Sequence, residues 1–163
     1  MPTNNKSKAN MMHRNIKEDN TYLSPDGIGS ILVSGEDTNG EFCIVHCSAK
    51  KDAGPPTHIH ENEDESFYVL DGEMTVFVGD KTLSAKTGDY VFLPRGIPHT
   101  FKVTSSEIKF LVTAYPAGFD SFVKETCVPY KEGVKFPELS PEVIQRGVEI
   151  SKRYGISYPN LNL

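Results

Sequence analysis

The amino-acid sequence predicts an all-β domain, either an antiparallel sandwich or a small barrel, that is followed by a C-terminal α-helix. Short apolar runs repeat between Tyr22 and Tyr115, turn signals separate them, and the sequence after Tyr115 changes to a helical pattern. The 163 residues suit one domain with a sizeable core. We therefore expect a mobile N-terminal arm over 1–19, a β-barrel over 20–116, and a helical extension over 117–163 that packs on the barrel.

The strands of the barrel are predicted from apolar runs at residues 27–35, 41–49, 57–60, 65–79, 81–96, 99–103 and 107–115. Turns are predicted at Asn39-Gly40, Asp71-Gly72, Gly79-Asp80, Gly88-Asp89 and from Pro94 to Pro98. The run at 27–35 is apolar enough to serve as an edge strand that pairs with a second copy of the chain.

The extension contains one well-marked helix in the segment "SPEVIQRGVEISKRYG". Ser140 is the expected N-cap, Pro141 suits the first helical position, and Gly155 can end the helix. Val143, Ile144, Val148 and Ile150 form an apolar stripe. This stripe predicts a helix that packs on the outside of the barrel or over its mouth.

Composition and charge exclude several classes of function. The formal net charge is −5 and the basic residues are scattered, so no nucleic-acid partner is expected. No apolar run is long enough to span a bilayer, and the first 15 residues lack the apolar segment of a signal peptide, so we expect no membrane and a cytoplasmic location. Cys43 and Cys47 share a strand face roughly 13 Å apart, too far to form a disulfide. With Cys127, they are expected to be reduced, buried thiols.

Two histidines one residue apart, His58 and His60, are the leading candidates for a functional site. On a strand they share a face, with Cα atoms roughly 6.5 to 7 Å apart. Their imidazoles can then bind one metal ion at about 2 Å from each nitrogen. The pair alone fits two exposed or hydrogen-bonded loop histidines equally well, so the neighbouring residues are needed to distinguish such histidines from a metal site.

The neighbouring acidic residues offer a third ligand. Glu65 opens the next apolar run and shares a strand face with Phe67, so it points into the barrel if Phe67 does. Glu61, Glu63 and Asp64 fall in the connecting turn, where we expect them to solvate the loop. Glu63 is the alternative ligand if the register of the strand is different.

A further histidine, His99, begins a strand directly after the turn from Pro94 to Pro98. The two prolines restrict the backbone before it, which suits the positioning of a ligand. Taken alone, a histidine at such a place indicates a hydrogen-bonded loop residue.

Taken together, the two segments resemble the paired motifs of the cupin superfamily. The first motif has two histidines around one residue, a glutamate after three or four residues and a glycine after six more, matched by His58, His60, Glu65 and Gly72. The second has glycine, five residues, Pro-x-Gly, two residues and histidine, matched by Gly88, Pro94, Gly96 and His99.

Two positions depart from the motifs. The motif has a glycine that is separated from the first histidine by five residues, and this chain has Asp52 at that position, with Gly54 nearby to make the turn. Where the motif has an asparagine after the last histidine, this chain has Val103. Neither position is a metal ligand in the family. The segment "AYPAGFDSFVKE" that follows the last strand is similar to single-domain cupins related to quercetin 2,3-dioxygenase.

The resemblance implies a double-stranded β-helix, the jelly-roll barrel of the cupins, and one divalent metal held by His58, His60, Glu65 and His99. Fe, Mn, Ni, Co or Zn are the candidate metals. Four ligands would close a tetrahedral zinc site, whereas an octahedral metal keeps two positions open. Glu65 is also the candidate catalytic residue, because a carboxylate that leaves the metal can carry a proton.

Strand parity predicts an apolar substrate pocket, although such residues usually belong to the core. The pocket is expected to consist of Phe67, Val76, Val78, Val91, Leu93 and Phe101. Three functions stay open: a metal-dependent oxygenase for a small aromatic or enolisable compound, an isomerase, lyase or hydrolase with a Lewis-acid metal, and a non-catalytic cupin that binds a small ligand. A homodimer is implied by the resemblance.

Overall fold

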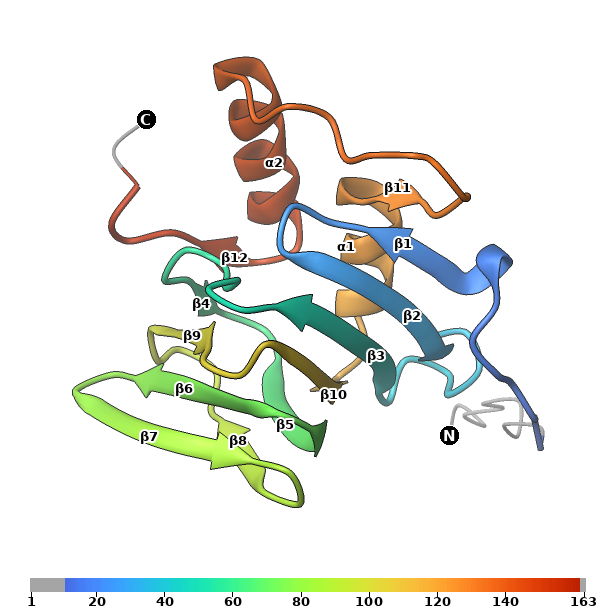
Figure 1. The fold of residues 1–163 in the computed structure, drawn as a ribbon. Coiled ribbons are helices and arrows are strands. Elements are labelled where there is room, and N and C mark those ends of the chain that lie inside the picture. Colours follow the sequence, from blue (N-terminus) through green and yellow to red (C-terminus); the bar gives the residue numbers. More distant parts are fainter. Residues whose placement is uncertain (1–10, 162–163) are drawn as a thin grey trace, which may run out of the picture.

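Two antiparallel β-sheets and two helices make up the fold of this computed structural model, which describes residues 11–161 (Figure 1). The helical elements are η1 (Glu18–Asn20), α1 (Phe119–Thr126) and α2 (Pro141–Arg153). The strands are β1 (Thr21–Leu23), β2 (Gly27–Val33), β3 (Cys43–Lys50), β4 (Ile59–His60), β5 (Asp64–Asp71), β6 (Glu73–Val78), β7 (Lys81–Lys86), β8 (Tyr90–Leu93), β9 (His99–Val103), β10 (Glu107–Tyr115), β11 (Val128–Pro129) and β12 (Ile156–Ser157).

The strands form a seven-stranded sheet in the order β11-β1-β2-β3-β10-β5-β8 and a three-stranded sheet in the order β7-β6-β9. A short ribbon pairs β12 with β4. Every apolar run predicted from the sequence contains strand residues, and the tail holds the predicted helix. The all-β fold with a C-terminal helix is therefore confirmed.

One glycine lets the chain change from one sheet to the other. Gly72 alone separates β5 from β6, and its φ angle of 90° lies in the left-handed region. A Cβ atom there would overlap the carbonyl oxygen of Glu107. Glycine is required because any side chain would combine an unfavourable backbone conformation with this overlap.

Apolar side chains from the inner faces of both sheets form the core. Val45 and Val69 of the large sheet, and Val76 and Val103 of the small sheet, are completely buried. A cluster of three aromatic rings joins the sheets, with ring centroids 5.4 to 5.6 Å apart: Phe67, Phe101 and Phe110. Alternation of apolar and polar residues along each strand produces this two-layer core.

The prediction that residues 27–35 form an edge strand is wrong. β2 lies between β1 and β3, and the edges of the large sheet are β11 and β8. The reason is that Thr21–Leu23 and Val128–Pro129 add two short strands beyond β2. Such short strands carry too few residues to give an alternating pattern that a sequence can reveal.

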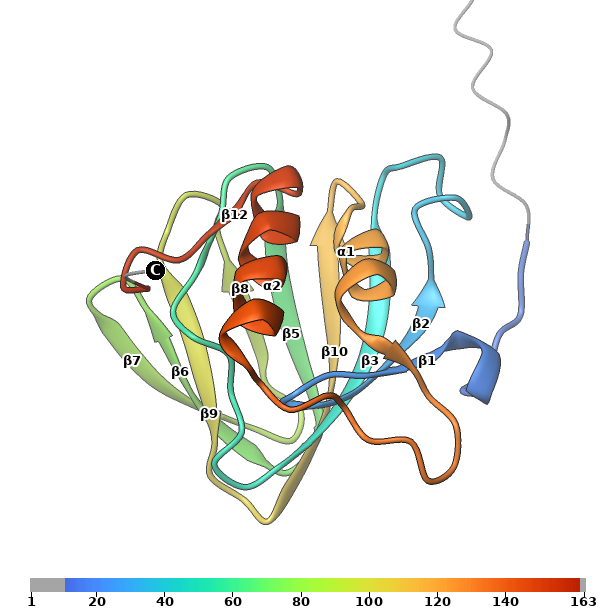
Figure 2. The same cartoon turned by 90° about the horizontal axis from the view of Figure 1, so that it is seen from above.

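The helices lie side by side across one side of the large sheet, in front of β5, β10 and β3 (Figure 2). α2 begins as predicted, with the Ser140 hydroxyl accepting a hydrogen bond from the Val143 N–H and Pro141 at the first position. Within residues 11–161 no helix has the length and apolar character needed to cross a bilayer.

The predicted N-terminal arm is only partly covered by the structure, because residues 1–10 lie outside the described residues. Arg14 donates a 2.7 Å hydrogen bond to Asp37, and η1 follows directly before β1. The mobility of the arm stays a prediction.

Candidate metal centre

Backbone pairing fixes the three histidines relative to one another. His58 lies directly before β4 and forms an isolated bridge with His99 of β9. The His58 N–H donates to the His99 carbonyl at 3.0 Å, and the His99 N–H donates to the His58 carbonyl at 2.9 Å. His60 follows on the same face of β4, whose other partner is β12. Two distant segments of the chain are thus joined at the site.

Glu65 is held by the central part of the large sheet. In β5 it pairs with Leu93 of β8 on one side and with Ala114 of β10 on the other. Its side chain is only 3% exposed and shares the inner face with Phe67, whereas Tyr68 on the outer face is 43% exposed. The alternation expected from the sequence is therefore correct for Glu65.

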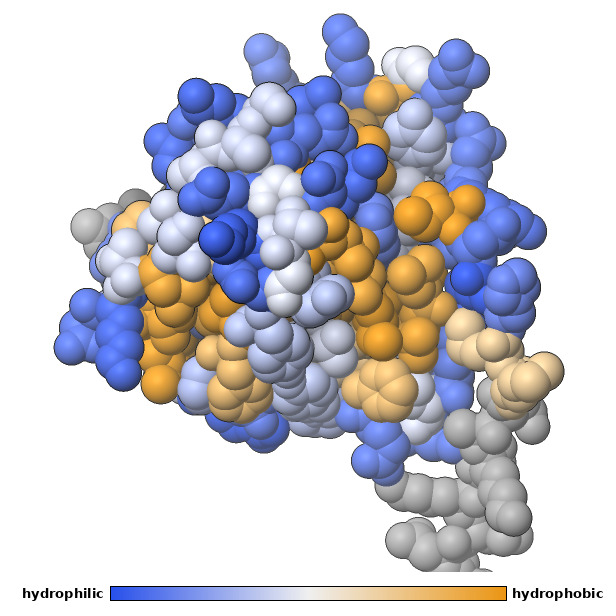
Figure 3. All heavy atoms as spheres, turned by 60° about the horizontal axis from the view of Figure 1, so that its bottom comes forward, coloured by the Kyte–Doolittle hydropathy of each residue, from blue (hydrophilic) through white to orange (hydrophobic). Residues whose placement is uncertain are grey.

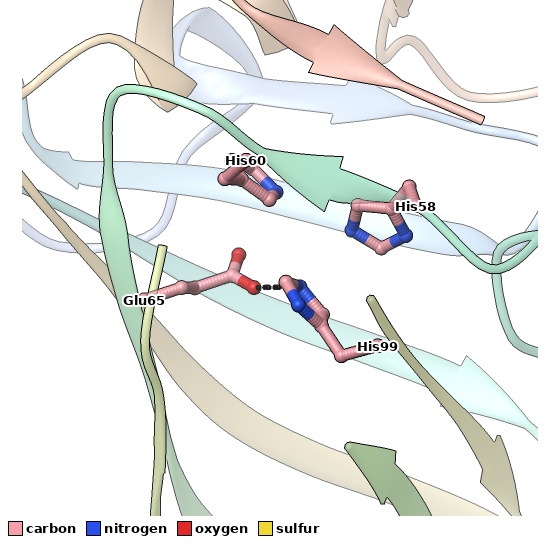
Figure 4. Close-up of side chains that lie close together, drawn as sticks. All are labelled: His58, His60, Glu65 and His99. Carbon is pink, nitrogen blue, oxygen red and sulfur yellow. Dashed lines mark ion pairs between the residues drawn. The ribbon is translucent and has the colours of Figure 1, made fainter. Parts of the chain in front are cut away.

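The four predicted ligands lie together, with one ligand atom from each within 4.8 Å of all the others (Figure 4). His99 Nε2 lies 3.2 Å from Glu65 Oε2, and both atoms are buried without a hydrogen-bond partner among the described residues. Side chains from β4, β5 and β9 point toward one common space in Figure 4.

The hydrogen bonds of the other ring nitrogens determine which nitrogens face that space. Nδ1 of His58 lies 2.9 Å from the carbonyl oxygen of Pro56, and Nδ1 of His99 lies 3.0 Å from that of Ile97. Nδ1 of His60 lies 3.1 Å from Glu63 Oε2. Carbonyl and carboxylate oxygens only accept, so each Nδ1 carries a proton, and a ring in its neutral form then has its lone pair on Nε2.

This arrangement fits a cation. His99 Nε2 faces the carboxylate oxygen of Glu65 at 3.2 Å, a separation that requires a proton or a cation between the two atoms because both are otherwise acceptors. Three imidazole nitrogens and one carboxylate are ligands suited to first-row divalent metals. The donor set therefore fits the metal that the sequence predicts.

Charge and burial shift the pKa values of three of the four candidate ligands. Burial, together with the charge of His99, lowers the pKa of His58 to about 4, so this imidazole is neutral at pH 7. Burial acts to raise the pKa of Glu65, but the His99 contact and the three nearby imidazoles lower it overall. For His60, burial acts to lower the pKa, and the Glu63 hydrogen bond and the Glu65 charge raise it overall.

A cavity of about 190 Å³ opens beside the ligands, between the inner face of the large sheet and the C-terminal extension. His58, His60 and Glu65 contribute to its wall, and most of the remaining wall is apolar. The aromatic members of the wall are Phe67, Phe101, Phe110, Phe119, Phe122 and Tyr158. Asp26 and Glu65 are the carboxylates among its lining residues.

Two of the six predicted pocket residues line this cavity, Phe67 and Phe101, and the other four do not. Val76, Val91 and Leu93 are buried in the core, and Val78 packs against it. Parity identifies the face of a strand that points inward, but the depth at which packing ends and a cavity begins depends on the elements that cover the barrel.

Several contributors to the site were missed or misread in the sequence. Glu63, expected to solvate the turn, is 4% exposed and contacts His60. Asp64 begins β5 and forms a 2.7 Å ion pair with Arg95, which had no predicted role. Phe119 and Tyr158 come from the extension, beyond both motifs, and only the apolar positions of its helical segments could have indicated them.

The cysteines are free thiols, as expected. Burial raises the pKa of Cys43 to about 11 and also raises the pKa values of Cys47 and Cys127. At neutral pH these thiols are protonated and are poor metal ligands or nucleophiles. The thiols of Cys47 and Cys127 belong to the lining of the cavity rather than to the metal centre.

A comparison with protein families identifies the family of the chain. A family model described as "Cupin domain" matches residues 45–115, the segment that contains all four candidate ligands. The chain belongs to the cupin superfamily. Its two sheets are accordingly the double-stranded β-helix of that superfamily, and solved structures described as a cupin and as a double-stranded β-helix domain share this fold.

Relatives of this cupin have different activities. Quercetin 2,3-dioxygenase of Bacillus subtilis (strain 168) is 28% identical over 120 residues, which are 74% of this cupin and 35% of the dioxygenase. Acetate kinase EutQ of Escherichia coli (strain K12) is 45% identical over 60 residues, 37% of this cupin and 25% of that protein. This cupin thus spans about a quarter to a third of the length of these relatives.

Among solved structures, ectoine synthase from P. lautus superimposes with a TM-score of 0.62 at 18% identity. The match covers 80% of this cupin and 100% of the synthase. At this identity the likeness shows the fold alone.

The two departures from the cupin motifs now have a structural explanation. Asp52, at the position of the expected glycine, has a φ angle of 69° and so adopts the left-handed conformation itself. Gly54 serves another purpose, because a Cβ atom there would overlap the carbonyl oxygen of Phe101. Val103, in place of the asparagine, is completely buried in the core. Neither departure touches the four ligands.

Proposed function

We propose that this cupin is a metal-dependent oxygenase of the dioxygenase type, acting on a small aromatic or enolisable compound. The observation that carries the proposal is the convergence of three Nε2 atoms and the Glu65 carboxylate beside a phenylalanine-lined cavity. The similarity to quercetin 2,3-dioxygenases of Bacillus subtilis and Aspergillus japonicus, both 28% identical, supports oxygenase chemistry over the alternatives.

The size of the cavity suggests the substrate class. A cavity of about 150 Å³ holds one benzene molecule, and this one measures about 190 Å³. A compound with one aromatic or enolic ring therefore fits better than a three-ring flavonol. The phenylalanine side chains offer edges and faces to a flat ring. Asp26, whose pKa burial raises, offers a hydrogen-bond acceptor to a hydroxyl or amino group of the substrate.

The residues of the site have separate tasks in this proposal. A divalent ion held by His58, His60, Glu65 and His99 supplies Lewis acidity and, for iron, manganese, cobalt or nickel, open coordination positions. Glu65 accepts the proton of the substrate hydroxyl on a carboxylate oxygen, because its buried side chain lines the cavity beside the ring. The apolar wall orients the ring and excludes water.

Oxygen consumption tests this proposal. Protein loaded separately with Fe²⁺, Mn²⁺, Co²⁺ or Ni²⁺ should take up one O₂ per substrate in a screen of catechols, single-ring phenols and cyclic enols, followed with an oxygen electrode. Glu65→Gln should lower the rate by about 100-fold or more, the size of a general-base contribution. Asp89→Asn, which removes the charge of a half-buried carboxylate from a turn away from the site, should leave the rate unchanged.

Two results would contradict the oxygenase. The first is metal-loaded protein that consumes no oxygen with any compound of the screen, which would contradict the oxygenase function. The second is product formation without oxygen uptake, which would favour the isomerase, lyase or hydrolase. The cytoplasmic location belongs to the same proposal, supported by the three free cysteines, since a reducing compartment keeps thiols free.

We further propose that the protein is a homodimer whose interface is the outer face of β5 and β8. Tyr68, Tyr90 and Phe92 are 43%, 60% and 50% exposed there, and Phe92 stacks on Tyr115 with ring centroids 6.4 Å apart. β5 and β8 lie in the lower part of Figure 1, which is turned toward the viewer in Figure 3. Figure 3 shows apolar side chains between polar ones on this face. Such aromatic patches are typical of interfaces.

Light scattering tests the dimer. The wild type should have about twice the mass of one chain at micromolar concentration, and Tyr90→Glu combined with Phe92→Glu should give monomers, because charges at the centre of an interface are costly. The same replacement on an exposed part of α2, Gln145→Glu with Lys152→Glu, should leave the dimer intact. A wild-type monomer would contradict the proposal.

A further inference from the structure

The three histidines of the metal centre are not held in the same way. The Nδ1–H groups of His58 and His99 donate to backbone carbonyls, whose positions the loops fix. The Nδ1–H group of His60 donates to a carboxylate, Glu63 Oε2, at 3.1 Å, and both side chains are at most 5% exposed. His60 is therefore the one ligand whose anchor can be changed by substituting a side chain.

The carboxyl group of Glu63 occupies the space that a side chain at position 118 would need. A Cβ atom built on Gly118 would overlap Glu63 Oε1, and within 4 Å it would meet only atoms of this carboxyl group. Gly118 has a φ angle of 167° and a ψ angle of −38°. The absence of a side chain at this position leaves room for the Glu63 carboxyl group.

Gly118 is itself fixed in place, so this room is a built feature. It is the residue before α1, and its carbonyl oxygen accepts a 3.0 Å hydrogen bond from the Phe122 N–H in the first turn of that helix. A continuous series of contacts therefore leads from α1 through Gly118 and Glu63 to His60. The start of the C-terminal extension and the ligand strand β4 meet at the Glu63 carboxylate.

A carboxylate that accepts from Nδ1–H has two effects on the ring. The hydrogen bond is charge-assisted and fixes the tautomer and orientation of the imidazole. It also makes the other nitrogen, Nε2, a better electron donor to a metal. The negative charge adds to that of Glu65 and offsets the charge of a divalent ion in a buried site.

We propose that Glu63 is a positioning residue that sets the metal affinity of this cupin through His60, and that Gly118 is required because it leaves space for the Glu63 carboxylate. This inference rests on the proposed metal centre. It assigns to the turn within the first motif, and to the start of the extension, a direct influence on how tightly the ion is held.

Calorimetric titration with Ni²⁺ at pH 7.5 measures the effect. Glu63→Met, which removes both charge and acceptor, should weaken Ni²⁺ binding by about 10- to 100-fold, and Glu63→Gln, which keeps an acceptor oxygen, should weaken it less. Gly118→Ala should cause a loss similar to that of Glu63→Met, although it removes no charge. Combining the two changes should add little, because both act on one contact.

Two matched variants serve as controls. Glu61→Gln removes a charge from an exposed position in the same turn, and Gly147→Ala adds a methyl group where the space is open. Both should bind Ni²⁺ as the wild type does. Histidine ¹⁵N–¹H spectra of the metal-free protein give a second readout: the Nδ1–H signal of His60 should shift or disappear in Glu63→Met and Gly118→Ala, while those of His58 and His99 remain.

The outcomes separate this inference from the proposal on which it rests. Wild-type affinity in both Glu63→Met and Gly118→Ala, or an unchanged His60 signal, would overturn the role of Glu63 and leave the metal centre standing. A wild-type protein that binds no Ni²⁺, Zn²⁺ or Mn²⁺ would overturn the metal centre and this inference together.

Discussion

Replacing His99 with alanine is expected to abolish metal binding. The purified wild type should contain close to one divalent metal per chain, and His99→Ala close to none after dialysis, as measured by plasma mass spectrometry. The reason is that the Nε2 atom of His99 faces the carboxylate of Glu65 at 3.2 Å across the space that the ion would occupy. Losing a ligand should weaken binding by more than the roughly 10- to 100-fold loss that follows removal of a ligand's hydrogen-bond partner.

A matched histidine outside the site controls for this change. His46→Ala removes a histidine from β3 that is not part of the cluster, and its metal content should equal that of the wild type. Circular dichroism and thermal unfolding without metal verify that His99→Ala is folded. A metal content unchanged in His99→Ala, or close to zero in the wild type, would contradict a metal centre at these residues.

The second large effect is on stability. Phe110→Ala should lower the free energy of unfolding by about 3 to 5 kcal/mol, measured by urea denaturation. Phe110 is 2% exposed, and its ring contacts those of Phe67 and Phe101, which belong to different sheets. Its removal leaves a cavity where the two sheets meet, and strands held by backbone hydrogen bonds cannot move to fill it.

Phe92→Ala is the matched control for this prediction. Phe92 lies in the same sheet but on its outer face, where half of its surface is exposed, so truncation should cost less than about 1 kcal/mol in the monomer. Both variants are measured at protein concentrations below the dissociation constant of the dimer, so that the two losses of stability are comparable. Equal losses for the two variants would show that the aromatic cluster does not hold the sheets together.

The sequence predicts that the candidate ligands lie together because they follow a strict geometric rule. Side chains alternate along a strand, so the position of Glu65 relative to the apolar Phe67 decides its direction without any knowledge of the partner strands. The residues alone give only weak support for His99 as a candidate ligand, and its prediction depends on the resemblance of two segments to paired cupin motifs. The backbone bridge between His58 and His99 gives the physical reason for that pairing.

Other parts of the site follow no such local rule. Glu63 looks like a solvated turn residue because its burial depends on Gly118, 55 positions away in the chain. Val76 and Leu93 point inward as predicted, but the extension covers a different part of the barrel and places the cavity elsewhere. Partners that are distant in sequence leave no periodic signal, so neither the anchor of His60 nor the cavity wall could be derived from the pattern.

The pairing of β4 with β12 has a consequence for how the protein acquires its metal. His60 lies opposite Ile156, a residue that is 2% exposed. Closing so long a loop is entropically costly, and contacts of high sequence separation form slowly during folding. The strand that carries His60 therefore gains this partner only after residues 156 and 157 have been synthesised. We expect the ion to bind after most of the barrel has folded. The supply of metal should therefore change the stability of the folded chain and not the order in which its sheets assemble.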